Sequence, residues 1–334
     1  MILFRTNGGK ETGLGHVMRC LSLAKALSVK CPEEAIIFRT NEEMRTLITE
    51  NGFDFQPSEE YTKQEAEVIR AQNPKMILFD SYLADTDYLR TIKQNVLLVQ
   101  FDDNNDIYTP VVADVVINGN IHAQNLEYES ETKKAKLLLG PEYLIMREEY
   151  QKSIKEKKGN GIMITTGGSD FLNLMPKFIK ALKDTEFQKR IIIGPAYTEE
   201  QIERIKRLTD RDQQFELVYK PKSLKEHIRN SEIVITAAGS TVYEVLKLKR
   251  IPIIYTLADN QKKIAAALVK EKVVSLGDYK EIEFEKEFII KRIESAKKSE
   301  NNYSDLYGLF DGKGVFRVVE EIEYIKDAVN CFKR

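Results

Sequence analysis

The chain has 334 residues, a length that predicts about two domains. Hydrophobic residues at 42% and charged residues at 31% are typical of a globular protein with buried cores. The 51 Lys and Arg against 52 Asp and Glu lack the basic surplus of a general nucleic-acid binder. No apolar run reaches the roughly 20 residues of a membrane-spanning helix, the N-terminus lacks a signal-peptide pattern, and the three cysteines have no metal-binding spacing. We therefore expect a cytoplasmic protein without a membrane span.

The first half of the chain alternates between short apolar runs and amphipathic stretches. The runs are rich in Val, Ile and Leu, which predicts strands buried on both faces of a parallel sheet. They cover residues 2–5, 35–38, 76–79, 96–101, 115–117 and 137–139. Apolar residues at helical spacing predict helices at residues 16–27, 42–50 and 63–72.

A charged stretch over residues 147–160 ends at glycines and predicts a helix that runs into a linker, with a domain boundary near residue 155. The alternation then restarts, with strands predicted at residues 162–165, 190–193, 215–219, 233–236 and 252–256 and helices at 172–182, 199–208 and 315–328. We predict two doubly wound, Rossmann-like α/β domains, at residues 1–155 and 156–310, that face a central cleft. The terminal segment 311–334 is expected to form a helix that packs back across the domains.

Three glycine-rich turns lead from strands into helices, where open parallel sheets bind ligands. They comprise residues 7–16, 165–170 and 236–241. Glycines allow close approach to the backbone, and helix starts favour phosphate. The first turn is not a P-loop, because Leu14 stands where lysine is needed. A flexible turn without a ligand, or a helix cap at Ser240 and Thr241, is the alternative interpretation. The presence of such turns in both domains favours a cleft that binds a diphosphate.

His16 is the candidate catalytic residue among three histidines. It follows a glycine at a helix start, where the helix dipole disfavours the imidazolium. A neutral imidazole in a phosphate-binding cleft can act as a general base. A purely structural histidine at the helix start is the alternative. His122, in a polar loop, and His227, in a charged helix, are expected at the surface.

Several acidic residues require separate interpretation. Asp85 and Asp87 have a D-x-D spacing that can mark a divalent metal site, but they precede a helical stretch, which favours capping. Asp210 and Asp212 repeat the spacing in a charged turn, and we expect no metal at either pair. Residues 102–106 follow a strand and therefore either border the ligand or form an ordinary polar loop.

Five motifs occur in order along the chain: residues 13–24 (GLGHVMRCLSLA), 80–82 (DSY), 167–170 (GGSD), 238–241 (AGST) with Glu244, and 257–261 (LADNQ). Together they resemble the UDP-sugar hydrolase family of pseudaminic acid biosynthesis and related spore coat polysaccharide proteins, in the glycosyltransferase-B superfamily. The resemblance implies cleavage of UDP-2,4-diacetamido-2,4,6-trideoxy-β-L-altropyranose to UDP and the free sugar. It implies no cofactor and no metal.

The resemblance also implies a role for each matched residue. His16 would activate the attacking water. The residues expected to contact the sugar and its pyrophosphate are Gly13, Gly15, Arg19, Tyr82, Asn260 and Gln261. Those expected to hold the nucleotide are Gly167, Gly168, Ser169, Gly239, Ser240, Thr241 and, on the ribose hydroxyls, Glu244. Because UDP leaves as a stable anion, one base suffices where a glycosidase needs two carboxylates, and attack from the opposite face inverts the anomeric centre.

Two other functions remain as alternatives. A glycosyltransferase of the same fold would place an acceptor, instead of water, beside His16. A non-catalytic nucleotide-sugar sensor would bind UDP without turnover, and the presence of both His16 and Glu244 disfavours it. The expected partner is a small UDP-sugar, and the expected state is a monomer.

Overall fold

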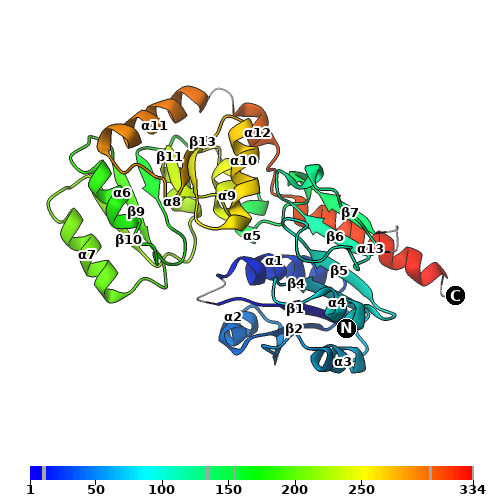
Figure 1. Cartoon of the computed structure of the whole chain (residues 1–334). Helices are drawn as coiled ribbons and strands as arrows, with labels where there is room; N and C mark the ends of the chain where they lie inside the picture. The colour runs from blue at the N-terminus through cyan, green and yellow to red at the C-terminus, as the bar shows by residue number, and fades with distance from the viewer. Residues whose placement is uncertain (10–12, 132–134, 154, 156, 301–302, 333–334) are drawn as a thin grey trace. The chain divides into compact units, whose positions relative to one another are not determined.

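The computed structural model describes residues 1–9, 13–131, 135–153, 155, 157–300 and 303–332, with side chains up to residue 325. It consists of two compact units (Figure 1). Unit 1 comprises Met1–Gln151 and Gly312–Arg334, and unit 2 comprises Lys152–Asp311. The C-terminal segment therefore belongs to unit 1.

Unit 1 is built on a seven-stranded parallel sheet with the order β3-β2-β1-β4-β5-β6-β7. Its strands are β1 (Ile2–Thr6), β2 (Ile36–Thr40), β3 (Asp54–Pro57), β4 (Met76–Asp80), β5 (Leu97–Phe101), β6 (Val115–Asn118) and β7 (Lys136–Leu139). β3 was not predicted, because this edge strand is polar and half exposed and has no apolar run.

Helices cover both faces of this sheet. They are α1 (Gly15–Lys30), α2 (Arg45–Glu50), α3 (Lys63–Ala71), α4 (Thr86–Lys93), α5 (Glu148–Gln151) and α13 (Gly314–Phe332), with short 3-10 turns η1 (Glu42–Met44), η2 (Ala123–Asn125) and η3 (Pro141–Tyr143). Alternate residues of each strand face opposite cores. Phe4 packs in the core that contains α1 and α13, whereas Leu3 packs in the core that contains α3 and α4.

Unit 2 repeats this arrangement with six parallel strands in the order β10-β9-β8-β11-β12-β13. Its strands are β8 (Ile162–Ile164), β9 (Lys189–Ile193), β10 (Phe215–Tyr219), β11 (Ile233–Ala237), β12 (Ile251–Thr256) and β13 (Val274–Asp278). Its helices are α6 (Met175–Leu182), α7 (Glu199–Thr209), α8 (Lys225–Asn230), α9 (Ser240–Lys247), α10 (Lys262–Lys270), α11 (Lys286–Ser299) and α12 (Ser304–Gly308), with a 3-10 turn η4 (Asp259–Gln261). The predicted fold class, two doubly wound Rossmann-like domains, is confirmed.

One helix of unit 2 begins later than predicted. The sequence indicated a start at Leu172, but α6 begins at Met175. The Asp170 carboxylate accepts hydrogen bonds from the backbone amides of Leu174 and Met175, at 2.8 and 3.0 Å. These bonds satisfy the unpaired amides of a helix start and therefore fix its position.

The strand order reverses between β1 and β4 in unit 1 and between β8 and β11 in unit 2. In parallel sheets of this kind, ligands bind at the carboxyl ends of the strands at such a switch point. The three glycine-rich turns follow β1, β8 and β11, so each lies at a switch point. Among the helices that the structure describes, none has the length and apolar character needed to cross a bilayer.

Candidate functional site

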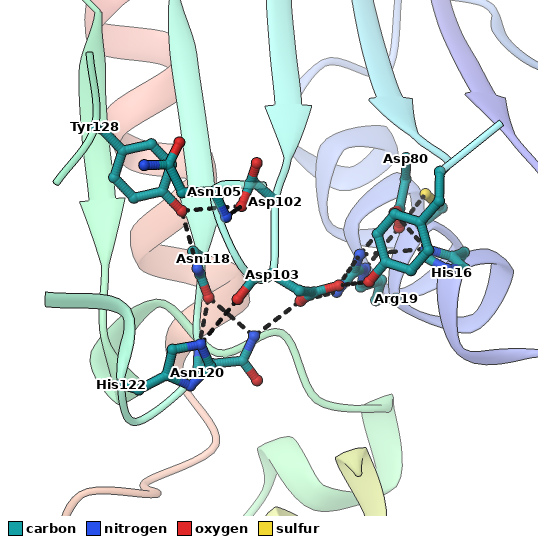
Figure 2. Close-up of polar contacts among 12 residues, drawn as sticks. His16, Arg19, Asp80, Asp102, Asp103, Asn105, Asn118, Asn120, His122 and Tyr128 are labelled. Carbon is teal, nitrogen blue, oxygen red and sulfur yellow. Dashed lines mark hydrogen bonds and ion pairs between the residues drawn. The ribbon is translucent and has the colours of Figure 1, made fainter. Parts of the chain in front are cut away.

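A network of polar side chains lies at the carboxyl ends of β4, β5 and β6 in unit 1 (Figure 2). His16 and Arg19 stand three residues apart in the first turn of α1, so they share one face of the helix. Asp80 is the last residue of β4, and Asp103 follows the end of β5. Parallel strands end at a common edge, which brings these four residues together although they are distant in sequence.

His16 and Asp80 form a base and carboxylate pair. Nδ1 of His16 lies 2.5 Å from Oδ1 of Asp80, and 3.3 Å from the guanidinium of Arg19. The shorter contact, to an anionic acceptor, decides the tautomer: Nδ1–H donates to Asp80. In the neutral imidazole, Nε2 is then the nitrogen that can accept a proton. A carboxylate that holds a histidine in this way is the arrangement of a general base.

Arg19 bridges the two carboxylates of the network. Its Nε and Nη2 donate to Asp80, both at 2.6 Å, and its Nη1 and Nη2 donate to Asp103 at 2.9 and 3.0 Å. Both pairings use two parallel N–H donors, the strongest geometry between arginine and a carboxylate. The guanidinium that we predicted to contact the substrate is therefore engaged by protein carboxylates.

Both carboxylates remain ionised. Burial alone would raise the pKa of Asp80 and of Asp103, but the nearby charge of Arg19 outweighs it and holds both pKa values below the ordinary range. His16 contributes in the same direction. Arg19, Asp80 and Asp103 together carry a net charge of about −1.

Tyr82 completes the inner part of the network. Its hydroxyl donates a hydrogen bond to Oδ2 of Asp103. Its ring stands perpendicular to the ring of His16, with centroids 4.6 Å apart. Burial and the charge of Asp103 raise the pKa of Tyr82, so the phenol stays protonated. The structure thus brings together three predicted site residues, His16, Arg19 and Tyr82.

The network continues outward along β6. Nδ2 of Asn120 donates to Asp103 at 2.8 Å and to Oδ1 of Asn118 at 2.9 Å. Asn118 in turn donates to the hydroxyl of Tyr128, which donates to Asp102 at 3.1 Å. This chain supports Asp103 from the side opposite Arg19, as Figure 2 shows.

His122 corrects a prediction, since it was expected at the surface. Its exposed fraction is 5%, and its Nε2 lies 3.0 Å from the backbone carbonyl oxygen of Asp103, to which Nε2–H donates. The physical reason is the turn after β6, which folds back onto the segment after β5. The polar loop therefore packs against the network.

The first glycine turn leads into this network. Gly9 and Gly13 form a short antiparallel bridge, and residues 10–12 between them lie outside the described part. Gly13 has a φ of +77°, which favours glycine. Gly15 has no such conformation, and a Cβ there would meet no atom within 4 Å. Nothing in the described structure requires glycine at 15, whereas the approach of a ligand to the helix start would.

The second glycine turn, in unit 2, has the same character. Gly167 has a φ of +90°, and a Cβ on either Gly167 or Gly168 would point into open space. Ser169 follows in the half-buried part of the turn. A Cβ on Gly194, the residue after β9, would lie 2.3 Å from the carbonyl oxygen of Gly168, so this position must be glycine for the turn to fit.

The third turn brings together predicted nucleotide and sugar residues. Gly239 occupies the cap position of α9, and no side-chain hydrogen bond caps the helix, so Ser240 and Thr241 are not its caps. The amide of Gln261 lies near Gly239, 3.8 Å from the position of a Cβ. Asn260, beside Gln261, is exposed.

Glu244, the predicted ribose ligand, lies in the second turn of α9 and is buried. The turns of residues 165–170 and 236–241 follow β8 and β11, which are neighbours in the sheet of unit 2. These two turns, which carry predicted nucleotide residues, thus lie at the carboxyl ends of neighbouring strands.

The D-x-D pairs have structural roles. Asp85 caps α4 by accepting from the amide of Tyr88, as predicted. Asp212 pairs with the buried ammonium group of Lys189 at 3.1 Å. Within the described ranges, no cluster of His, Cys, Asp and Glu side chains is arranged to hold a metal ion.

Sequence reasoning assigned no role to three residues of the network. Asp80 lies within a motif, Asp103 lies in a segment whose sequence fits both a ligand border and a polar loop, and no pattern in the sequence singles out Asn120. The available signal was positional: each stands at, or within two residues of, the end of an apolar strand, where parallel sheets expose side chains to a ligand.

The fold is shared with solved structures of other proteins. The solved structures that match include MurG of Acinetobacter baumannii, with a TM-score of 0.66 and 14% identity over 97% of this chain and 99% of that one. CalG4, the calicheamicin glycosyltransferase, has a TM-score of 0.66 and 13% identity over 98% of both chains. The chain has the glycosyltransferase-B fold.

Comparison of sequences identifies relatives of this chain. The chain is 25% identical to the UDP-2,4-diacetamido-2,4,6-trideoxy-beta-L-altropyranose hydrolase of Campylobacter jejuni, over 81% of this chain and 96% of that one. It is 25% identical to the spore coat polysaccharide biosynthesis protein SpsG of Bacillus subtilis, over 72% of each chain. The chain is thus similar in sequence to both of these proteins.

A third relative is the uncharacterized protein MJ1062 of Methanocaldococcus jannaschii, with 29% identity over 73% of this chain. The match spans about half of that relative's length, 53%. No protein-family model matches the chain.

Proposed function

We propose that the chain is an enzyme that acts on a UDP-sugar. Within that class we propose a hydrolase that cleaves a UDP-2,4-diacetamido-2,4,6-trideoxyhexose to UDP and the free sugar, in nonulosonic acid or surface polysaccharide biosynthesis. The observation that carries the proposal is the His16–Asp80 pair, at the sheet edge where this fold binds ligands. The names of the C. jejuni and B. subtilis relatives support the substrate class.

In the proposed reaction, Nε2 of His16 removes a proton from water while the water oxygen attacks the anomeric carbon. The bond between that carbon and the diphosphate oxygen breaks, and its electron pair leaves with UDP. Attack from the face opposite UDP inverts the anomeric configuration. Asp80 holds the ring through Nδ1 and stabilises the imidazolium that forms.

The leaving group needs no acid, because UDP is a stable anion. The amides of the glycine turns in unit 2, together with the start of α9, would bind its diphosphate, and Glu244 would bind the ribose hydroxyls. Gly13 and Gly15 would leave space for the sugar and pyrophosphate in unit 1, and Asn260 and Gln261 would contact the sugar.

A glycosyltransferase is the second candidate. The same base would remove the proton of an acceptor hydroxyl, and the matching solved structures include enzymes of that class. The two candidates differ only in the nucleophile beside Nε2.

A time course without an acceptor tests the proposal. The purified protein is incubated with a panel of UDP-sugars that includes the 2,4-diacetamido-2,4,6-trideoxy species, and UDP and free sugar are measured separately. Equal release of both from one member, lost in His16→Asn, is expected. Binding of UDP without release across the panel would reject the hydrolase and leave the transferase or the sensor.

A further inference from the structure

Asp103 is surrounded by hydrogen-bond donors. Its Oδ1 accepts from Arg19 Nη1 and Asn120 Nδ2, at 2.9 and 2.8 Å. Its Oδ2 accepts from Arg19 Nη2 at 3.0 Å and from the hydroxyl of Tyr82. Each carboxylate oxygen therefore has two donors, and an anion in this position keeps all four bonds directed toward itself.

This arrangement fixes what Tyr82 can offer to a bound molecule. A phenol has one proton to donate and two lone pairs that accept. The proton of Tyr82 is committed to Asp103, so only the lone pairs of its oxygen remain. The ring is half-buried, and its centroid lies 4.6 Å from that of the His16 ring.

We propose that Asp103 is a positioning residue. Its carboxylate holds the hydroxyl proton of Tyr82 in a hydrogen bond, so that Tyr82 can contact the substrate only as a hydrogen-bond acceptor. The sugar must then carry a donor at this point, the N–H of an acylamino group or an O–H group. A carbonyl or phosphate oxygen would be rejected there, because two acceptors would face each other. The assignment of this donor to a sugar rests on the proposed function.

The substitution Asp103→Asn tests the proposal because it changes polarity with little change in shape. At Oδ1 its amide nitrogen would face two donors, the guanidinium of Arg19 and the amide nitrogen of Asn120. At Oδ2 it would face one obligate donor, Arg19 Nη2, and the Tyr82 hydroxyl, which can rotate and accept instead. We therefore expect the amide nitrogen at the place of Oδ2. The phenol proton then turns toward the substrate. Asp106→Asn is the matched control, since it removes the same charge from an exposed residue of the same loop.

The first measurement needs no substrate. Protein labelled with ¹³C at the tyrosine Cζ is compared by NMR, with the Tyr82 signal assigned from its loss in Tyr82→Phe. We expect the signal of wild type to move upfield in Asp103→Asn and to stay unchanged in Asp106→Asn. An unchanged signal in Asp103→Asn would overturn the proposal.

The second measurement is a double-mutant cycle on turnover. Asp103→Asn should lower kcat/KM about 10- to 100-fold while the affinity for UDP alone is retained. In the Tyr82→Phe background the same substitution should cost a clearly smaller factor, because the hydroxyl is already absent. Equal factors in both backgrounds would show that Asp103 does not act through Tyr82.

Substrate analogues identify the donor. Removal of the N–H or O–H that Tyr82 accepts should lower kcat/KM in wild type and cost nothing further in Tyr82→Phe. If no single analogue behaves so, the claim of selection by Tyr82 is wrong. If wild type turns over no UDP-sugar at all, the proposed function fails, whereas the Cζ measurement still decides the role of Asp103.

Discussion

The two units share a strand order and place glycine turns at their switch points, yet they build different kinds of site. In unit 1 the turn leads into His16 and Arg19, which meet carboxylates from two neighbouring strand ends. In unit 2, two side chains beside the turns bond to the backbone: Asp170 accepts from the amide of Leu174 at the start of α6, and Gln261 accepts from the amide of Leu257. One topology thus supports a network of side chains in unit 1 and, in unit 2, the glycine turns that we propose bind the nucleotide. The first suits proton transfer, and the second suits binding of an anion.

The strongest test of this division is His16→Asn. Loss of the base should lower turnover about 10²- to 10⁴-fold, because a positioned general base contributes a factor of that size. The affinity for UDP, measured by calorimetry, should be retained, since UDP is expected to bind unit 2. Parallel losses of affinity and turnover would make His16 a binding residue and would break the division.

Asp80→Asn should have the next largest effect. The asparagine cannot stabilise an imidazolium or hold the Nδ1–H tautomer, so turnover should fall about 10²- to 10³-fold. UDP affinity should again be unchanged. A loss of less than threefold in turnover would show that His16 works without its carboxylate.

Glu244→Gln probes unit 2. If the carboxylate binds the ribose hydroxyls, its replacement should weaken UDP affinity about 10-fold, since a hydrogen bond to a charged group contributes about 1.5–3 kcal/mol. The kcat at saturating substrate should change little. Unchanged affinity for UDP would contradict the assignment of Glu244.

The pair Gly168→Ala and Gly308→Ala compares a glycine that we propose faces the ligand with a glycine that does not. A Cβ at 168 meets no protein atom within 4 Å, so folding should be unaffected, while a bound diphosphate should be crowded and UDP affinity should fall several-fold. Gly308→Ala, at the end of α12, is the control, because its Cβ is equally free and far from the turns in sequence. Equal UDP affinity in both variants would remove the second turn from the binding site.

Asp103 gives a smaller, pH-dependent effect on stability. Its pKa is lower in the folded state than in the unfolded chain, so its contribution is present above the unfolded pKa of about 3.9 and is lost as pH falls through the folded pKa. The free energy of unfolding of wild type minus that of Asp103→Asn, from urea titrations, should be constant from pH 8 to 5 and should shrink below about pH 4. A decrease between pH 8 and 6 would contradict the ionisation described for this residue.

Much of the fold could be predicted from the sequence because buried parallel strands leave continuous apolar runs. The exceptions were informative: β3 is polar, and β13, with Ser275 and Gly277, has no such run. The start of α6 depends on a cap by Asp170 that composition does not reveal.

The candidate site was predictable only where motifs were local. His16, Arg19 and Tyr82 stood in recognisable motifs, whereas Asp103 and Asn120 depend on which strands become neighbours. Strand order is a property of the tertiary fold, so a polar loop residue after β5 could not be distinguished from an ordinary one. His122 was misplaced for the same reason.

The return of the C-terminal segment to unit 1 affects how the chain can fold during synthesis. Val315, Val318 and Ile322 of α13 belong to the same core as Phe4 and Leu21. The ribosome therefore completes the whole of unit 2 before it supplies the last helix of unit 1. Unit 2 can fold as soon as it emerges. The core of unit 1, which is made first, stays partly uncovered until residues 315–322 have been made.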